Sequence, residues 1–167
     1  MKFNETLKTA TIRNLYNGNE FTARFPMDED ELVNIADRAS CHGSHDYIVV
    51  CVEGCYNLIS SDYVSLLDVN DVAERVERLE DDDAEKLEAM AEYCDNLDDI
   101  ERAWDDSYFY ANTTLADYAE LHAKECGYLE AVPEFIRGYI DWEDMAEDMK
   151  IDDGYSEING GVLFVAK

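Results

Sequence analysis

The sequence from residue 68 to residue 106 reads DVNDVAERVERLEDDDAEKLEAMAEYCDNLDDIERAWDD. It holds 17 Asp or Glu residues against 4 Lys or Arg residues, a net charge of −13. Apolar residues nevertheless recur at helical spacing in three runs, which are Val72, Val76 and Leu79; Leu87, Met90, Ala91 and Cys94; and Leu97, Ile100 and Trp104. This pattern predicts folded helices with a buried stripe and an acidic outer surface, not a disordered tail.

The three runs predict three helices: one ending near Leu79, one over residues 83–94 and one over residues 97–104. The spacing of Glu85, Glu88, Glu92 and Asp95 is three, four and three, which places all four on one helix face. Like charges at such spacing destabilise a helix by about 0.2–0.5 kcal/mol per pair. We therefore interpret the acidic face as functional.

Strand signals lie on both sides of this segment. Residues 9–15 and 20–25 flank Asn17-Gly18 and predict a β-hairpin, followed by a helix over 28–39 and a strand over 47–52 that pairs with the hairpin. After the acidic segment the sequence predicts five further elements. They are a strand or connector over 108–112, a helix from Thr113 or Thr114 to Cys126, a short helix from Pro133 to Ile140, a helix over 142–149, and a hairpin of 155–158 with 162–165.

The expected fold class is therefore α+β, an elongated chain of three small domains. Residues 1–60 form an N-terminal domain with an antiparallel sheet and a helix. Residues 61–106 form an acidic helical domain. Residues 107–167 form a C-terminal domain of helices and a β-hairpin.

The totals restrict the possible partners. The chain has 167 residues and a formal net charge of −27, yet 47% of its residues are hydrophobic, as in a globular protein. Such a charge excludes direct binding to nucleic acid or to an anionic membrane and predicts partners with basic surfaces. The N-terminal MKFNETLKTATIR lacks an apolar signal region, and five cysteines suit a reducing compartment, so we expect a cytoplasmic protein. Cys51, Cys94 and Cys126 are predicted to pack as small hydrophobic residues.

No standard catalytic or cofactor motif is present, and we expect neither an enzyme nor a bound cofactor. The ligand types of a zinc site occur at Cys41, His42, His45, Cys51 and Cys55. Their spacing matches no standard zinc finger, so loop histidines and packed cysteines are the favoured interpretation, and the role of this cluster stays open. The Asp81-Asp82-Asp83 run gives at most loose binding of a divalent cation.

Duplex DNA carries one negative charge per roughly 1.7 Å, so 27 charges correspond to about 46 Å of duplex. The sharpest hypothesis is a decoy whose carboxylates stand in for phosphates in the groove of a DNA-binding protein. The carboxylates expected to form this surface are Glu74, Glu77, Asp81, Glu85, Glu88, Glu92, Asp95, Asp98, Asp99, Glu101, Asp105, Asp117, Glu120, Asp141, Glu143, Asp144, Glu147 and Asp148. A merely solvated helix face and halophilic adaptation are the alternatives.

Residues 127–167, GYLEAVPEFIRGYIDWEDMAEDMKIDDGYSEINGGVLFVAK, resemble the C-terminal part of the ArdA antirestriction proteins. The opening TIRNLYNGNEFTARFPM and the HDYIVV strand are also similar to that family. The resemblance implies a homodimeric mimic of bent B-form DNA, encoded by a phage or mobile element. It would occupy the DNA-binding groove of type I restriction–modification enzymes, in contact with the specificity and methyltransferase subunits.

The resemblance also implies roles for part of the C-terminal region. Leu129, Glu130, Val132 and Pro133 correspond to the antirestriction motif of the family. Family members dimerise through this region, which suggests Val132, Phe135, Tyr139 and Ile140 as interface residues, although each could equally belong to the core. The family often has Gly-Arg-Asp-Leu where this chain has Ala146-Glu147-Asp148-Met149.

Two further function classes stay open on the residues alone. One is an acidic interaction module, such as a chaperone for a histone-like or other basic protein. The other is an enzyme that depends on a divalent cation.

Overall fold

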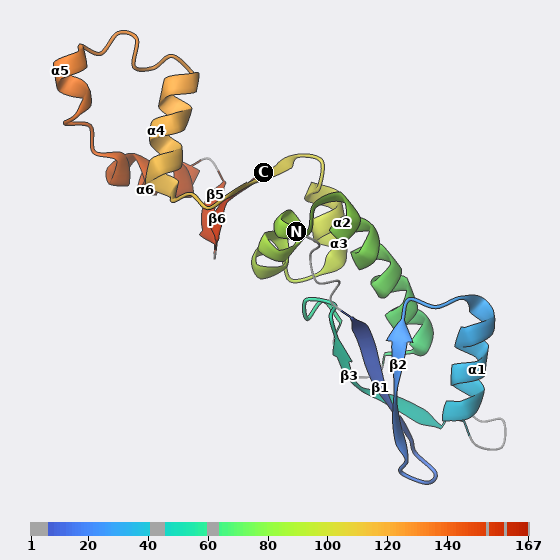
Figure 1. The fold of residues 1–167 in the computed structure, drawn as a ribbon. Coiled ribbons are helices and arrows are strands. Elements are labelled where there is room, and N and C mark those ends of the chain that lie inside the picture. Colours follow the sequence, from blue (N-terminus) through green and yellow to red (C-terminus); the bar gives the residue numbers. More distant parts are fainter. Residues whose placement is uncertain (1–6, 41–45, 60–63, 153, 159, 167) are drawn as a thin grey trace. The chain divides into compact units, whose positions relative to one another are not determined.

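The computed structural model describes residues 7–40, 46–59, 64–152, 154–158 and 160–166. It is 48% helical and 23% strand, which confirms the α+β class (Figure 1). The chain divides into two compact units. The N-terminal unit comprises Met1–Ala84 with Asp95–Leu97, and the C-terminal unit comprises Glu85–Cys94 with Asp98–Lys167. The division into three domains at residues 60 and 106 stays a prediction.

The sheet of the N-terminal unit has the order β2-β1-β3, with antiparallel neighbours. Its strands are β1 (Lys8–Asn14), β2 (Glu20–Phe25) and β3 (Tyr47–Glu53). The predicted hairpin and its third strand are thus confirmed. Helix α1 (Glu29–Ala39) begins at Asp28, whose side chain accepts a hydrogen bond of 2.8 Å from the backbone N–H of Glu31. Such a cap satisfies one of the unpaired donors at a helix start.

Alternate residues of β1 face the core of this unit. Lys8, Ala10, Ile12 and Asn14 are all buried, and the residues between them are half-buried. Ala10 and Ile12 pack with side chains from β2, α1, β3 and the first turns of α2. The core thus lies between the sheet and two helices.

Helix α2 (Leu66–Tyr93) runs where the sequence predicts two separate helices. Its backbone is non-helical at Asp83 alone, with φ −155° and ψ 96°. The two predicted helices are therefore real and meet at a kink at Asp83, but the first of them continues a few residues beyond its expected end near Leu79. The start of α2 is fixed by Ser65, which exchanges hydrogen bonds with Asp68: the Asp68 N–H donates to Ser65 Oγ, and the Ser65 N–H donates to the Asp68 carboxylate. This is a capping box, with Asp in place of Glu.

On the first part of α2, Val76 and Leu79 are buried as predicted, and only Val72 differs from the predicted stripe. Leu66, Val69, Ala73 and Val76 are buried, whereas Val72 is only half-buried. In the second part Leu87 and Met90 are buried as predicted, and so are Ile100 and Trp104 of the α3 region.

Helix α3 (Leu97–Ala103) is followed by a turn at Trp104. Lys86 of the second part of α2 binds this turn. The Lys86 ammonium donates to the Trp104 carbonyl over 2.6 Å and lies 4.4 Å from the centre of the Trp104 ring. A cation at this distance from an indole face is attracted by the ring.

The second sheet has the order β4-β6-β5 and is antiparallel. Its strands are β4 (Ser107–Ala111), β5 (Tyr155–Ile158) and β6 (Gly161–Val165), so the predicted C-terminal hairpin is confirmed. Gly161 is required here, because a Cβ atom at this position would lie 2.1 Å from the Tyr110 carbonyl oxygen.

Three helices accompany this sheet: α4 (Leu115–Glu125), α5 (Glu134–Arg137) and α6 (Trp142–Asp152). Thr114 caps α4 as predicted. Helix α5 is shorter than the predicted 133–140, because its helical backbone ends at Gly138. The core of α4 and α6 against the sheet is built from Leu115, Tyr118, Ala119, Ala146, Met149 and Val162.

Candidate functional site

The predicted acidic surface begins on the first part of α2. Glu74, Glu77 and Asp81 are exposed, and each follows a residue of the stripe formed by Ala73, Val76 and Glu80. One residue turns a helix by about 100°, so all three carboxylates lie beside the buried stripe on one flank. The packing of α2 thus decides where these charges point.

In the C-terminal unit, Glu85, Glu88 and Glu92 are exposed along the second part of α2. Asp95 is also exposed, but it lies beyond the end of the helix at Tyr93, so its placement on the same helix face is wrong. Around α3, Asp98 and Asp105 are exposed, whereas Asp99 and Glu101 are half-buried.

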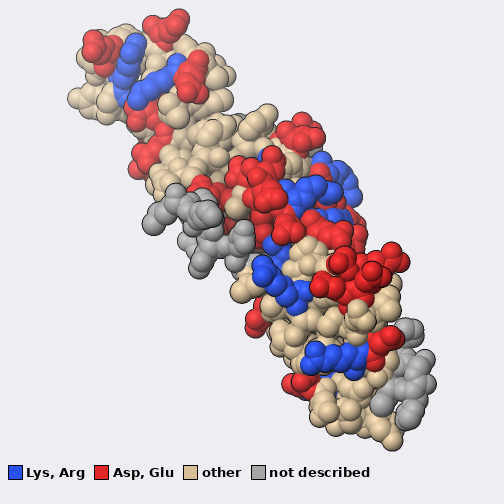
Figure 2. All heavy atoms as spheres, turned by 45° about the vertical axis from the view of Figure 1, so that its right-hand side comes forward, with Lys and Arg blue, Asp and Glu red and all other residues tan. Residues whose placement is uncertain are grey.

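The remaining carboxylates of the predicted surface lie on α4, on α6 and just before α6. Asp117, Asp141, Glu143, Asp144, Glu147 and Asp148 are exposed, and Glu120 is half-buried. On the face drawn in Figure 2, Asp and Glu side chains form several patches, with Lys and Arg side chains and uncharged residues between them. The predicted acidic residues are thus accessible, and none of them is buried.

Some of these carboxylates have a local partner. Asp99 pairs with Arg102 at 2.7 Å, Glu120 pairs with Lys124 at 2.6 Å, and Glu147 pairs with Lys150 at 2.7 Å. The Glu147 hydrogen bond raises the pKa of the exposed Lys150 ammonium. These pairs weaken the local negative potential, so the three carboxylates contribute less to it than their neighbours do.

Other carboxylates hold helix ends. Asp117 accepts a hydrogen bond of 2.7 Å from the Thr114 hydroxyl, and Asp141 accepts one of 3.1 Å from the Asp144 N–H at the start of α6. At the start of α2, the hydrogen bonds from Ser65 lower the pKa of the Asp68 carboxyl. The charge at these positions also favours the helix dipole.

The residues that were predicted to form an antirestriction-type motif lie in a turn between α4 and α5. Leu129 and Val132 are half-buried, and Glu130 and Pro133 are exposed. Arg137 of α5 donates to the backbone carbonyls of Leu129 (2.8 Å) and Val132 (3.0 Å). One guanidinium thus fastens both ends of the motif, an interaction that the sequence pattern did not reveal.

The predicted interface residues differ in their exposure. Phe135 and Tyr139 are 77% and 88% exposed, whereas Val132 and Ile140 are half-buried. Tyr128, at 62%, also faces solvent and was missed by sequence reasoning. Residues 127–140 contain Glu130, Glu134 and Arg137 as their charged residues, so this apolar surface is nearly neutral. Exposed apolar patches are common at protein contact sites, and the role of these residues as a dimer interface stays a prediction.

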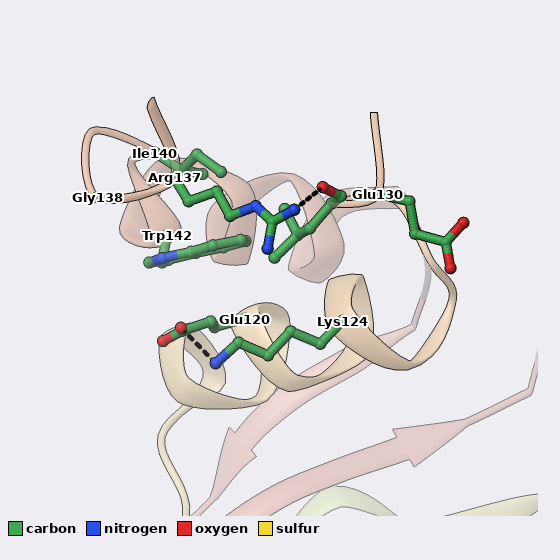
Figure 3. Close-up of a pocket in the computed structure, with 8 residues that line it drawn as sticks. Glu120, Lys124, Glu130, Arg137, Gly138, Ile140 and Trp142 are labelled. Atoms are coloured by element: carbon green, nitrogen blue, oxygen red, sulfur yellow. Dashed lines mark hydrogen bonds and ion pairs between the residues drawn. The ribbon is translucent and has the colours of Figure 1, made fainter. Parts of the chain in front are cut away.

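A pocket of about 630 Å³ lies behind this segment. Figure 3 shows the Glu120–Lys124 pair of α4 on one side and Arg137 on the opposite side, with the Trp142 ring between them and the Glu130 carboxylate turned away. Leu129 and Ile140 also line it. Both cations already bind partners within the chain: Lys124 pairs with Glu120 on the same helix, and Arg137 binds the backbone carbonyls of Leu129 and Val132.

The cysteines do not all pack as predicted. Cys94 is half-buried, but Cys51 and Cys126 are exposed, because Cys51 faces outward on β3 and Cys126 lies at the C-terminal end of α4. Cys55 is buried, and burial raises the pKa of its thiol to about 11. Of the possible zinc ligands, Cys41, His42 and His45 lie outside the described residues. Within the described part of the chain, no three His, Cys, Asp or Glu side chains gather as a metal site requires.

None of the helices in the described ranges combines the length and the apolar character that a membrane span needs. The chain is thus a small acidic α+β protein whose described helices expose carboxylates to solvent.

Comparison with known families makes this assignment more specific. The model of the family described as "Antirestriction protein (ArdA)" matches residues 18–164, and the chain belongs to this family. Its members are inhibitor proteins that act on restriction–modification enzymes. A comparison with curated proteins found no match.

Proposed function

We propose that this protein is a mimic of B-form DNA that occupies the DNA-binding groove of a type I restriction–modification enzyme. The exposed carboxylates of α2, α3, α4 and α6 take the place of backbone phosphates. They meet the Lys and Arg side chains with which the specificity and methyltransferase subunits hold DNA.

The observation that carries the proposal is the accessibility of the carboxylates in a member of an antirestriction family. Glu74 and Glu77 in the N-terminal unit, and Glu85, Glu88 and Glu92 in the C-terminal unit, all reach solvent from helices with buried stripes. Charges on a packed helix are held in place before binding, so less entropy is lost when they meet a basic groove. Many weak pairs then act together, each worth roughly 0.2–1 kcal/mol.

The active form in this proposal is a homodimer. Two chains of net charge −27 repel one another over most of their surface. The neutral segment at residues 127–140 is therefore a favourable dimer interface, because two copies repel each other least there. The exposed rings of Phe135 and Tyr139 supply apolar area that dimerisation can bury. Val132 and Ile140 are less accessible and would contribute mainly by supporting these rings.

Competition with DNA tests the proposal directly. A purified type I methyltransferase–specificity complex is titrated with this protein at several salt concentrations, with and without a duplex that carries its recognition site. We expect tight binding that weakens steeply with salt and is lost when duplex is in excess. Simultaneous binding of duplex and protein to the enzyme would refute the mimic.

A cell-based assay tests the biological consequence. Cells with an active type I system are infected with unmodified phage, with and without expression of this protein. We expect the phage to plate at higher efficiency when the protein is present. A matched strain without the restriction system should show no difference.

A further inference from the structure

Two residues of the N-terminal unit break the apolar pattern of their elements. Lys8 stands on the core-facing side of β1, in line with Ala10 and Ile12. Glu80 continues the stripe of α2, because Leu66, Val69, Ala73, Val76 and Glu80 follow one another at spacings of three, four, three and four. A charged residue at either position is unfavourable unless it is paired.

The structure brings these two residues together. The Lys8 ammonium lies 2.5 Å from a carboxylate oxygen of Glu80, and the two side chains are only 6% and 17% exposed. The other Glu80 oxygen accepts a hydrogen bond of 3.0 Å from the Tyr56 hydroxyl. Both oxygens of the carboxylate are thus bound, by groups far away in the sequence.

The turn that delivers Tyr56 is itself unusual. Tyr56 and Asn57 both have positive φ angles, of 49° and 59°, which non-glycine residues rarely adopt. Gly54 passes so close to β1 that a Cβ atom there would lie 2.7 Å from the Leu7 carbonyl oxygen. Beside the pair, Cys55 is buried, and Lys8 and Glu80 both act on its thiol. Such backbone conformations persist where surrounding contacts demand them.

We infer that Lys8 and Tyr56 are positioning residues that hold Glu80 against the sheet and thereby fix the rotation of α2 about its own axis. This rotation matters because Glu74, Glu77 and Asp81 lie beside the buried stripe and change direction with any turn of the helix. Apolar packing along the stripe is non-directional, whereas a carboxylate whose two oxygens must each meet a donor fixes the rotation more sharply. The inference rests on the proposed function, since it concerns how α2 presents charge to a basic groove.

If only the total charge of the protein matters, Lys8→Met should not weaken binding to the enzyme complex. If the Lys8–Glu80 pair positions α2, it should. This substitution makes the protein more negative by one charge, so a purely electrostatic mimic should bind the enzyme complex at least as tightly as wild type. If the pair positions α2, the same variant should bind about tenfold more weakly. Glu80→Gln, which makes the protein less negative, should weaken binding in the same direction.

The salt dependence of binding separates positioning from a general loss of folded protein. The slope of log affinity against log salt reports the number of charge contacts made. Misdirected carboxylates lower this slope, whereas a smaller folded fraction lowers the affinity and leaves the slope unchanged. Arg102→Met is the matched control, because it removes a cation of the same charge from an exposed pair in α3. It should bind no more weakly than wild type, with the same slope.

The exchange variant Lys8→Glu/Glu80→Lys restores the pair in reverse at constant net charge and should recover most of the slope. If Lys8→Met does not fold, this variant tests the inference in its place. Tyr56→Phe removes one hydrogen bond to Glu80 and should lower the affinity and the slope less than Lys8→Met does. Wild-type affinity and slope in folded Lys8→Met, or weaker binding at an unchanged slope, would overturn the inference. A wild-type protein that duplex does not displace would refute the proposed function instead. In that case, hydrogen exchange in residues 66–82 of wild type and Lys8→Met still tests whether the Lys8–Glu80 pair holds α2. Residues 87–93 serve as the reference.

Discussion

The acidic helices and the segment from residue 127 to residue 140 present opposite surfaces to solvent. In the stretch 68–106 apolar side chains are packed inward, carboxylates face outward, and the net charge is −13. In residues 127–140 the net charge is −1, and the most exposed large apolar side chains are the rings of Tyr128, Phe135 and Tyr139. The backbone there is held by the guanidinium of Arg137, not by a long regular element.

The difference shows how one chain combines repulsion and association. A surface rich in carboxylates suits a basic partner and rejects a second copy of itself. A neutral apolar segment favours contact with a second copy of the chain and offers little attraction to a basic partner. If the two surfaces have these separate tasks, substitutions in one should leave the task of the other intact.

The largest expected effect is on self-association. Phe135→Ser/Tyr139→Ser removes the two most exposed rings of the neutral segment, and central aromatic residues typically contribute about 2 kcal/mol or more each to an interface. We expect the dimer dissociation constant to rise by at least about 100-fold. Sedimentation equilibrium measures it.

The melting temperature should stay close to wild type at protein concentrations where wild type is also monomeric, because both rings are exposed. Leu67→Ser, which removes a 68%-exposed apolar side chain from α2, is the control and should leave the dimer unchanged. A double variant that still dimerises like wild type would place the interface elsewhere.

The second effect is on binding to a basic partner. Glu85→Gln/Glu88→Gln/Glu92→Gln neutralises three exposed carboxylates on one side of α2. At roughly 0.2–1 kcal/mol per exposed pair, affinity for the restriction–modification enzyme should fall by about 3- to 150-fold, and the salt slope should decrease. Titration by fluorescence anisotropy at three salt concentrations gives both quantities.

Glu29→Gln/Asp30→Asn/Glu31→Gln makes the same change of net charge in α1, outside the predicted surface. Its affinity should stay closer to wild type. Equal losses in the two triple variants would mean that total charge, and not its placement, governs binding.

The third effect is confined to the neutral segment and concerns Arg137. Arg137→Met removes both hydrogen bonds that fasten the motif, at about 0.5–1.5 kcal/mol each. Faster hydrogen exchange should appear in residues 127–133, and dimerisation should weaken, while residues 85–93 exchange as in wild type. Arg137→Lys keeps the charge but not the paired donors, so it should behave like Arg137→Met. Protection of 127–133 in both variants would mean that the motif holds its shape without this side chain.

Sequence reasoning succeeded where the deciding contacts are local. Asn17-Gly18 marks the first hairpin and Thr114 marks the start of α4, because each acts on neighbouring residues. It failed at the start of α2, where the Ser65–Asp68 capping box was overlooked and Val72 was assigned to the stripe.

Long-range contacts could not be predicted from the sequence for a different reason. The pairing of β4 with β6 joins Ser107 to Val165, and no local pattern specifies such a partner. The accessibility of the carboxylates could be predicted from helical period, but the role of Arg137 could not, since its acceptors are backbone carbonyls. Glu80 was detectable in principle as a carboxylate in an apolar stripe.

The smallest effect concerns the overlooked start of the acidic helix. Ser65→Ala removes the cap of α2 and should cost about 1 kcal/mol at pH 7, measured by urea unfolding. The hydrogen bonds from Ser65 lower the pKa of Asp68 below its ordinary value of 3.8. A carboxyl with a lowered pKa stabilises the fold above that value and loses its contribution as the pH falls through the folded-state pKa. The difference in unfolding free energy between wild type and Ser65→Ala should therefore shrink at low pH, and only modestly, because Asp68 is exposed.

Ser65→Thr is the control, because it keeps the hydroxyl. Its unfolding free energy should follow that of wild type at both pH 7 and pH 3. A difference between wild type and Ser65→Ala that is the same at pH 7 and at pH 3 would show that the hydroxyl acts on the backbone alone and not on the charge of the Asp68 carboxylate.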